Sequence, residues 1–253
     1  MRRTTRRMMV VTPMAAIVAA CGGDTGSSPT TRLPDPVGLS FAVAQPGASA
    51  DRLFDAGPGG HTLDLSQIQL VLARIRMRKV GEPEPGCAGP NETHPCTELK
   101  AGPVLVDLPV HGGLVTPIST DIPAGSYDRL LLNIFAPSGD DEASVAFRAA
   151  NNWPRLAGMR VKGTYDGQAF DLFLNVNAEI FTRLDPVFVV TADKSSPLNA
   201  TVQVDPHTWF KQADGTLIDP RALTADKSLL DFVTANVRQS FKAFSDNQRK
   251  GHA

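Results

Sequence analysis

Short apolar runs alternate with turns along the chain, which is the pattern of β-strands joined by tight connections. Gly, Pro, Asn and Asp separate these runs. We expect strands at Val37 to Ala44, Ser66 to Val80, Val104 to Leu108, Ile118 to Ile122, Tyr127 to Phe135, Ile180 to Leu184, Val187 to Thr191 and Leu198 to Val204. The fold class that follows is all-β, and residues 37–204 are predicted to form an antiparallel β-sandwich domain.

The longest run, Ser66 to Val80, changes phase near Leu72-Ala73. Its apolar residues share one parity up to Leu72 and the other parity from Ala73 onward. A β-bulge at this point keeps a single buried face, because one extra residue restores the alternation. The side chains on the opposite parity are then predicted to point to water, and they are Arg74, Arg76 and Arg78.

The pair Asp166-Gly167 predicts a hairpin, because both central positions of a type I′ turn need positive φ. Such a turn pairs Tyr165 with Gln168 and thereby sets the register of both strands. Apolar residues of the two strands then meet on one face and opposite charges meet on the other. The predicted pairs are Val161 with Leu172, Met159 with Leu174, and Lys162 with Asp171.

Residues 205–253 are predicted to be a helical C-terminal extension packed on the sandwich. Asp205-Pro206 and Asp219-Pro220 each resemble an N-cap followed by a proline at the first helical position. From Asp226 to Phe244, apolar residues recur at helical spacing, which predicts an amphipathic helix. A helix that binds a partner or a membrane surface is the functional alternative.

The N-terminus has the layout of a lipoprotein signal peptide. Arginines precede a short apolar run, and Val18-Ala19-Ala20-Cys21 ends that run as a lipobox. The run is shorter than the roughly 20 apolar residues of a membrane-spanning helix. We expect residues 1–20 to be cleaved as a signal peptide, although an ordinary signal peptide with a chance cysteine is the alternative.

Cys21 is then expected to carry lipid. The pattern resembles that of bacterial lipoproteins, in which the cysteine bears a diacylglycerol on sulfur and an amide-linked acyl chain such as palmitate on nitrogen. More than one chain is needed for stable anchoring. Residues 21–36 continue as a flexible linker, since they are rich in Gly, Ser, Thr and Pro and nearly free of large apolar side chains.

Charge changes the picture of possible partners. Residues 1–20 contain four arginines and no acid, so their removal takes the formal net charge from −1 to about −5. Nucleic-acid binders cluster Lys and Arg to neutralise phosphates, whereas these residues are scattered here, which argues against nucleic acid. The predicted location is the cell envelope outside the cytoplasm, and Gly22 favours the outer membrane if the host is Gram-negative.

Once Cys21 is assigned to lipid, the remaining cysteines are Cys87 and Cys96. Two cysteines in an oxidising compartment predict a disulfide. The alternative is a metal site formed by Cys87, His94, Cys96 and Glu92, but their spacing matches no established zinc pattern.

Common catalytic frameworks are absent from the sequence: it has no G-x-S-x-G, no H-E-x-x-H, no phosphate-binding glycine loop and no dinucleotide fingerprint. Asp140-Asp141-Glu142 is either a divalent-ion site or the cap of a short helix through Phe147. A calcium loop from Asp246 to Gly251 is disfavoured, because Lys250 stands where an oxygen ligand is needed. The histidines are spread along the chain and are expected to be surface or capping residues: His61, His94, His111, His207 and His252.

Aromatic side chains offer a further possibility, a sugar-stacking platform. Its candidates are Trp153, Trp209, Phe210, Tyr127 and Tyr165. The alternative is that Trp209-Phe210 forms an apolar plug beneath the C-terminal helix.

Five stretches follow one another in a recognisable order: VAAC at 18–21, Ile68 to Met77, Gly102 to Leu108, Ile122 to Tyr127 and Val204 to Phe210. In this array the chain resembles uncharacterised bacterial lipoproteins with a domain of unknown function. The resemblance implies a transthyretin-like or immunoglobulin-like β-sandwich and no activity. A weaker resemblance is to periplasmic proteins linked to copper-peptide handling, for which no ligand residue can be matched.

The sequence thus predicts a lipid-anchored, extracytoplasmic envelope protein that is not an enzyme. Its domain would be a binding or scaffold module of unknown ligand, without cofactor, whose partner is the membrane through the lipid anchor. The alternative is a periplasmic or surface receptor for a metal or a glycan.

Overall fold

A computed structural model describes residues 37–44, 53–82, 96–192 and 198–246, all of which belong to the unit Pro34–Ala253. The chain is mostly β, as the alternating pattern predicted. Its strands are β1 (Val37–Val43), β2 (Leu53–Ala56), β3 (Thr62–Lys79), β4 (Thr97–Leu108), β5 (Val115–Thr120), β6 (Gly125–Ile134), β7 (Met159–Tyr165), β8 (Gln168–Leu174), β9 (Ala178–Val190), β10 (Leu198–Val204) and β11 (Phe241–Ser245).

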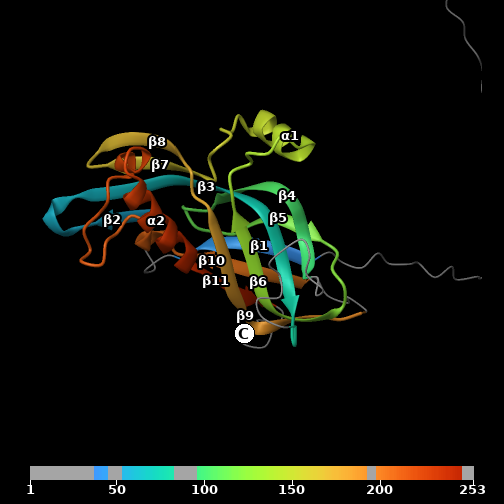
Figure 1. The fold of residues 1–253 in the computed structure, drawn as a ribbon. Coiled ribbons are helices and arrows are strands. Elements are labelled where there is room, and N and C mark those ends of the chain that lie inside the picture. Colours follow the sequence, from blue (N-terminus) through green and yellow to red (C-terminus); the bar gives the residue numbers. More distant parts are fainter. Residues whose placement is uncertain (1–36, 45–52, 83–95, 193–197, 247–253) are drawn as a thin grey trace, which may run out of the picture. The chain divides into compact units, whose positions relative to one another are not determined.

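The strand β3 is the spine of the sheet. Along one edge it pairs first with β7 and then with β6, and along the other edge first with β2 and then with β4. Figure 1 shows β3 as a long strand between the β7–β8 hairpin and the pair formed by β6 and β9. Because four strands take their register from β3, its own alternation decides which of their residues face the core.

The predicted change of phase in β3 is confirmed. Its register with both β4 and β6 shifts between Leu72 and Arg74. As a result Leu72 and Ile75 both lie in the core with no exposed surface. The prediction that three arginines point to water was wrong for Arg78, which is only 8% exposed. Arg78 lies on the outer face of the sheet, but neighbouring side chains cover it.

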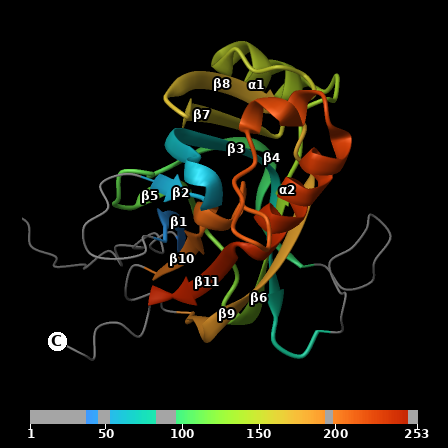
Figure 2. The ribbon, with the colours of Figure 1, turned by 90° about the vertical axis from the view of Figure 1, so that its left-hand side faces the viewer.

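The other half of the sheet is not antiparallel. The strand order is β5-β1-β10-β11-β9-β6-β3-β7-β8, with β2 and β4 paired to β3 off this path. β1 runs parallel to β10, and β11 runs parallel to β9. The sheet is therefore mixed and curled, and the prediction of a purely antiparallel arrangement was wrong. Figure 2 shows β10, β11 and β9 together on the side away from β7 and β8.

The hairpin between β7 and β8 has the predicted register in every pair. Asp166 and Gly167 have φ of 51° and 76°, the left-handed values that a type I′ turn requires. On the outer face Asp171 lies 3.7 Å from the Nζ of Lys162 and 2.7 Å from Arg160. Apolar pairing on the inner face and charge pairing on the outer face therefore agree on one register.

The sequence pattern places the N-termini of the helices correctly. The Asp205 and Asp219 side chains accept hydrogen bonds at the starts of two 3-10 helices, Pro206–Thr208 and Pro220–Thr224. Asp141 caps α1 (Glu142–Asn151), so the acidic cluster there is a helix cap. Asp226 caps α2 (Lys227–Gln239), accepting from the backbone N–H groups of Ser228 and Leu229.

The predicted helix from Asp226 to Phe244 is too long at its C-terminal end. α2 ends at Gln239, and residues 241–245 form β11 between β10 and β9. The buried side chains Phe241, Ala243 and Ser245 repeat with the period of a strand. The segment 205–253 is thus not a purely helical extension, because part of it completes the sheet.

One core lies against the inner faces of both halves of the sheet. It takes apolar side chains from β1, β3, β6, β7 and β10 and from α2, which contributes Val233 and Val237. α2 lies alongside β9 (Figure 2), and the Arg238 guanidinium donates to the backbone carbonyl of Asn177 just before that strand. A smaller cluster on the outer face joins Val71 of β3 to Phe147 of α1.

Gly163→Ala should destabilise the fold by about 1–3 kcal/mol, because overpacking carries this cost. Gly163 of β7 pairs with Leu65, and a Cβ there would lie 2.0 Å from the carbonyl oxygen of Asp64. Ser66→Ala is the control, because Ser66 is an exposed residue of β3 and such surface substitutions change stability by less than about 0.5 kcal/mol. Equal shifts of the urea midpoint for the two variants would contradict the close approach of β7 to β3.

Candidate functional site

Three arginines lie side by side on the outer face of the sheet. Arg78 of β3 pairs with Arg129 of β6, and Arg129 pairs with Arg183 of β9. Like charges directly opposite each other on neighbouring strands are destabilising. A row of guanidinium groups across three strands therefore requires compensation by carboxylates, by solvent or by a bound anion.

A bulge in β9 opens a recess beside this row. β9 holds four residues, Leu184 to Val187, between its pairings with Arg129 and Tyr127, whereas β6 holds only Asp128 there. The bulge contains the cis peptide bond between Asp185 and Pro186. A proline in a strand is accommodated at bulges, where its missing N–H leaves no gap in the ladder.

The recess has a volume of about 570 Å³ and is open to solvent. Its lining combines the three guanidinium groups with two carboxylates and two apolar side chains. The lining residues are Arg78, Asp128, Arg129, Arg183, Leu184, Asp185 and Val187. Among the described residues of this lining, arginines outnumber aspartates by three to two.

Asp128 neutralises Arg78, the most buried of the three arginines. Arg78 donates through Nε to Oδ1 at 3.1 Å and through a terminal nitrogen to Oδ2 at 2.8 Å. The two side chains are 9% and 29% exposed. A two-pronged Arg–carboxylate pair is rigid as well as charged, so it holds the Arg78 guanidinium in place at the wall of the recess.

The chemistry available in the recess is anion binding. Guanidinium groups present fixed donors that match carboxylate and phosphate oxygens. None of the described residues that line it carries a hydroxyl, thiol or imidazole group. The three guanidinium groups of the lining can therefore hold an oxyanion.

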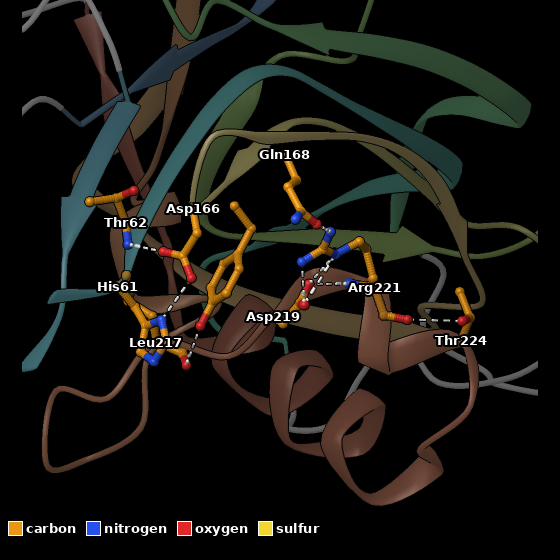
Figure 3. Close-up of polar contacts among 9 residues, drawn as sticks. His61, Thr62, Asp166, Gln168, Leu217, Asp219, Arg221 and Thr224 are labelled. Atoms are coloured by element: carbon orange, nitrogen blue, oxygen red, sulfur yellow. Dashed lines mark hydrogen bonds and ion pairs between the residues drawn. The ribbon is translucent and has the colours of Figure 1, made fainter. Parts of the chain in front are cut away.

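A second polar cluster surrounds the β7–β8 turn (Figure 3). The Nδ1 of His61 lies 2.7 Å from an oxygen of Asp166, whose other oxygen accepts the backbone N–H of Thr62 at 2.9 Å. The Thr62 N–H, followed by His61, lowers the pKa of Asp166. The His61 ring stacks on that of Tyr165, with centroids 5.6 Å apart.

Arg221 closes this cluster from the other side. It forms a two-pronged pair with Asp219 and donates to Gln168 of β8 (Figure 3). Its guanidinium lies 5.8 Å from the centre of the Tyr165 ring. Burial raises the pKa of Tyr165. The groups of the cluster satisfy one another, so it ties the hairpin to the start of β3 and to the 3-10 helix at Pro220–Thr224.

A third cluster joins β2 to the segment after β10. Asp55 lies 3.3 Å from the Nδ1 of His207 and 2.8 Å from the Nζ of Lys211. Burial by itself raises the pKa of Asp55, but hydrogen bonds from His207 and Lys211 outweigh it and hold that pKa below its usual value. The Asp55 side chain is 12% exposed, so this cluster is a largely buried polar contact that connects β2 to the segment after β10.

No protein-family model matches the chain, and no curated protein matches it. Among solved structures, MbnP from Methylosinus trichosporium is similar to this chain. The match has a TM-score of 0.41 and 13% sequence identity, and it covers 83% of this chain and 98% of that chain.

The histidines considered in the sequence analysis lie in different parts of the structure. His61 and His207 lie in the second and third clusters, His111 lies in the turn after β4, and His94 and His252 lie outside the described residues. Within the described part of the chain, no group of three or more His, Cys, Asp or Glu side chains could hold a metal ion.

The hypothesis of an aromatic sugar-stacking platform is wrong. All five rings are buried, with exposed fractions of 0% for Tyr127 and Trp209, 1% for Phe210, 5% for Trp153 and 7% for Tyr165. The alternative is confirmed for Trp209, whose indole N–H donates to Ser240 at the end of α2 at 2.7 Å. Four of these rings lie in the main core and Trp153 packs in the smaller cluster beneath α1, so none offers a stacking face to a sugar.

The lipidation site and the predicted disulfide stay predictions. Cys21, Cys87, Glu92 and His94 lie outside the described residues, and Cys96 directly precedes β4. Across residues 37–44, 53–82, 96–192 and 198–246, no helix has the length and apolar character needed to cross a membrane.

Sequence reasoning identified the arginines of β3 but missed Arg129 and Arg183. Each of the two sits in a strand that was predicted, at a position facing away from the apolar parity of that strand. Alternation within each run could have placed them on the outer face. Only the pairing of β3, β6 and β9 brings the three arginines into one row.

Asp55→Asn should lower the free energy of unfolding by about 1–3 kcal/mol at pH 7, because Lys211 and His207 lose a charged hydrogen-bond partner. The pKa of Asp55 is depressed in the folded state, so its contribution is complete above the usual pKa of 3.8 and is lost as pH falls through the lower folded pKa. The stabilities of the two proteins, measured by denaturant melts, should therefore begin to converge below about pH 4 and meet only below the folded pKa.

Asp231→Asn is the matched control, because Asp231 is 63% exposed and pairs only along α2 with Lys227. It should change stability by less than about 0.5 kcal/mol. A difference between wild type and Asp55→Asn that stays constant from pH 7 to pH 2 would contradict the assigned role of the Asp55 carboxylate.

Proposed function

We propose that this chain is a lipid-anchored, extracytoplasmic binding module without enzymatic activity, and that its β domain binds an anionic ligand. The observation that carries the proposal is the recess lined by Arg78, Arg129 and Arg183. The three guanidinium groups come from three adjacent strands, and the row they form is exposed at Arg183. An anion seated there relieves the repulsion among them.

The anchoring part of the proposal is supported by the sequence. Cys21 ends an apolar run behind four arginines, and residues 22–36 separate it from β1. Residues 1–20 are the proposed signal peptide, and the outer membrane is the proposed location in a Gram-negative host. Membership in a family of bacterial lipoproteins with a domain of unknown function is proposed on the same motifs.

We also infer that the curled sheet is organised as a β-sandwich with α2 packed on it. Supporting observations are the single core shared by β1, β3, β6 and β10, and the burial of Val233 and Val237 of α2 in it. The outer face of such a sandwich is free to carry binding residues, and the arginine row lies on that face. A rigid sheet is a suitable support, because sites built on strands hold their geometry better than sites on loops.

Arg183→Gln should weaken binding of inorganic phosphate by about tenfold to a hundredfold, since one charge-assisted hydrogen bond contributes roughly 1.5–3 kcal/mol. Isothermal titration of phosphate and of sulfate into the full chain measures the loss. The fold should be retained, because Arg183 is exposed, and an unchanged melting temperature checks this.

Arg155→Gln is the matched control, because Arg155 is 55% exposed and pairs with Asp140 near α1. Its phosphate affinity should equal that of the wild type. Equal losses in the two variants would indicate a response to total charge and would remove the recess as the binding site.

Cys21→Ala should abolish incorporation of radiolabelled palmitate when the full chain is expressed in a bacterial host, because no thiol remains to start lipidation. Cys87→Ala is the control and should keep the label. Labelling that persists in Cys21→Ala would contradict the lipid anchor.

A further inference from the structure

Beside the arginine recess, the outer face of β9 carries large apolar side chains in place of polar ones. Phe181 is 54% exposed, Val187 is 40% exposed and Val189 is 45% exposed. They alternate with buried residues along β9 and share its outward face with Arg183. We call Phe181, Val187 and Val189 the β9 strip.

The β9 strip and the recess are continuous. Val187 lines the recess, and Phe181 stands two residues before Arg183 on the same face. α1 covers a different part of the outer face, where Phe147 and Trp153 pack on Val71. The arginine row and the β9 strip are therefore a charged and an apolar surface that meet on one strand.

The arginine row and the β9 strip together favour an anion with an apolar part over a small inorganic anion. A small inorganic anion could occupy the recess, but it would leave the β9 strip exposed to water. A ligand with an anionic head and an apolar body contacts guanidinium groups with the one part and removes Phe181 and Val187 from water with the other. The arrangement is complementary to an amphiphile.

The charge of the recess indicates the head group. Arginines outnumber aspartates among the described residues that line it, and a phosphodiester brings the anionic oxygens that guanidinium groups bind. Its two non-bridging oxygens match the paired donors of a guanidinium group.

We propose that the recess and the β9 strip bind an anionic phospholipid of the membrane to which Cys21 is anchored. This inference rests on the proposed function and specifies its ligand. The fifteen residues between Cys21 and Val37 reach at most about 55 Å even when fully extended, so the tethered domain remains close to the bilayer. A tether of this kind raises the effective concentration of the lipid head groups, so a modest affinity is enough.

The test uses the full chain with Phe181→Trp, which places an exposed tryptophan in the β9 strip. The native Trp153 and Trp209 are 5% and 0% exposed and are shielded from lipid. The protein is mixed with vesicles of phosphatidylcholine, or of phosphatidylcholine with phosphatidylglycerol, whose acyl chains are brominated. Quenching of tryptophan fluorescence by the bromine atoms reports contact of position 181 with the acyl region.

We expect quenching only with phosphatidylglycerol, and an apparent affinity at least tenfold weaker when Arg183→Gln or Arg129→Gln is added. Arg155→Gln in the same background should leave the quenching unchanged. Equal quenching by both vesicle types would show apolar adsorption alone and would overturn the lipid assignment.

Titration of inorganic phosphate separates this inference from the proposed function. Phosphate binding that depends on Arg183, without quenching by phosphatidylglycerol, would overturn the lipid assignment and leave an anion-binding module that takes a soluble ligand. If Arg183→Gln keeps both the phosphate affinity and the quenching by phosphatidylglycerol vesicles of the unsubstituted recess, both proposals are overturned.

Discussion

The bulge in β3 between Leu72 and Arg74 is the constraint on which the rest of the structure depends. β3 is 18 residues long, and its apolar residues change parity at the bulge. The bulge keeps both sets on one face, so Leu72 and Ile75 lie in the same core. Four strands pair with β3 and inherit its faces. A one-residue slip would reverse every side chain beyond the bulge and bring the arginines inside. The burial of Ile75 and Met77 therefore holds the arginine row outside.

The proposed site follows from the pairing of three strands, which places like charges side by side on the outer face. Register with β3 and β9 places Arg129 between two other arginines. Asp128 compensates Arg78, and the bulge of β9 opens the recess where the row meets water. Such an arrangement is a physical reason to look for an anionic partner at this place.

Local signals were good predictors where neighbouring residues decide the structure. Asp166-Gly167 set a hairpin and its full register, because the turn and the alternation on both strands agree. Phe241 and Phe244 misled, because their spacing also fits a helix. Ser240 ends α2 by donating to the Val237 carbonyl and accepting from Trp209. The next five residues then form β11 between β10 and β9. The local sequence does not show that the sheet has a place for a strand there.

The sequence by itself determined which residues of each strand share a face, where the turns and helix caps lie, and which cysteine begins the proposed anchor. These properties depend on neighbours in the chain, through alternation, backbone φ and side chains that cap nearby N–H groups. Only the tertiary structure decided the parallel pairings, the burial of all five candidate aromatic rings and the meeting of Arg78, Arg129 and Arg183. Each of these depends on pairing between segments far apart in the chain, which the core selects as a whole.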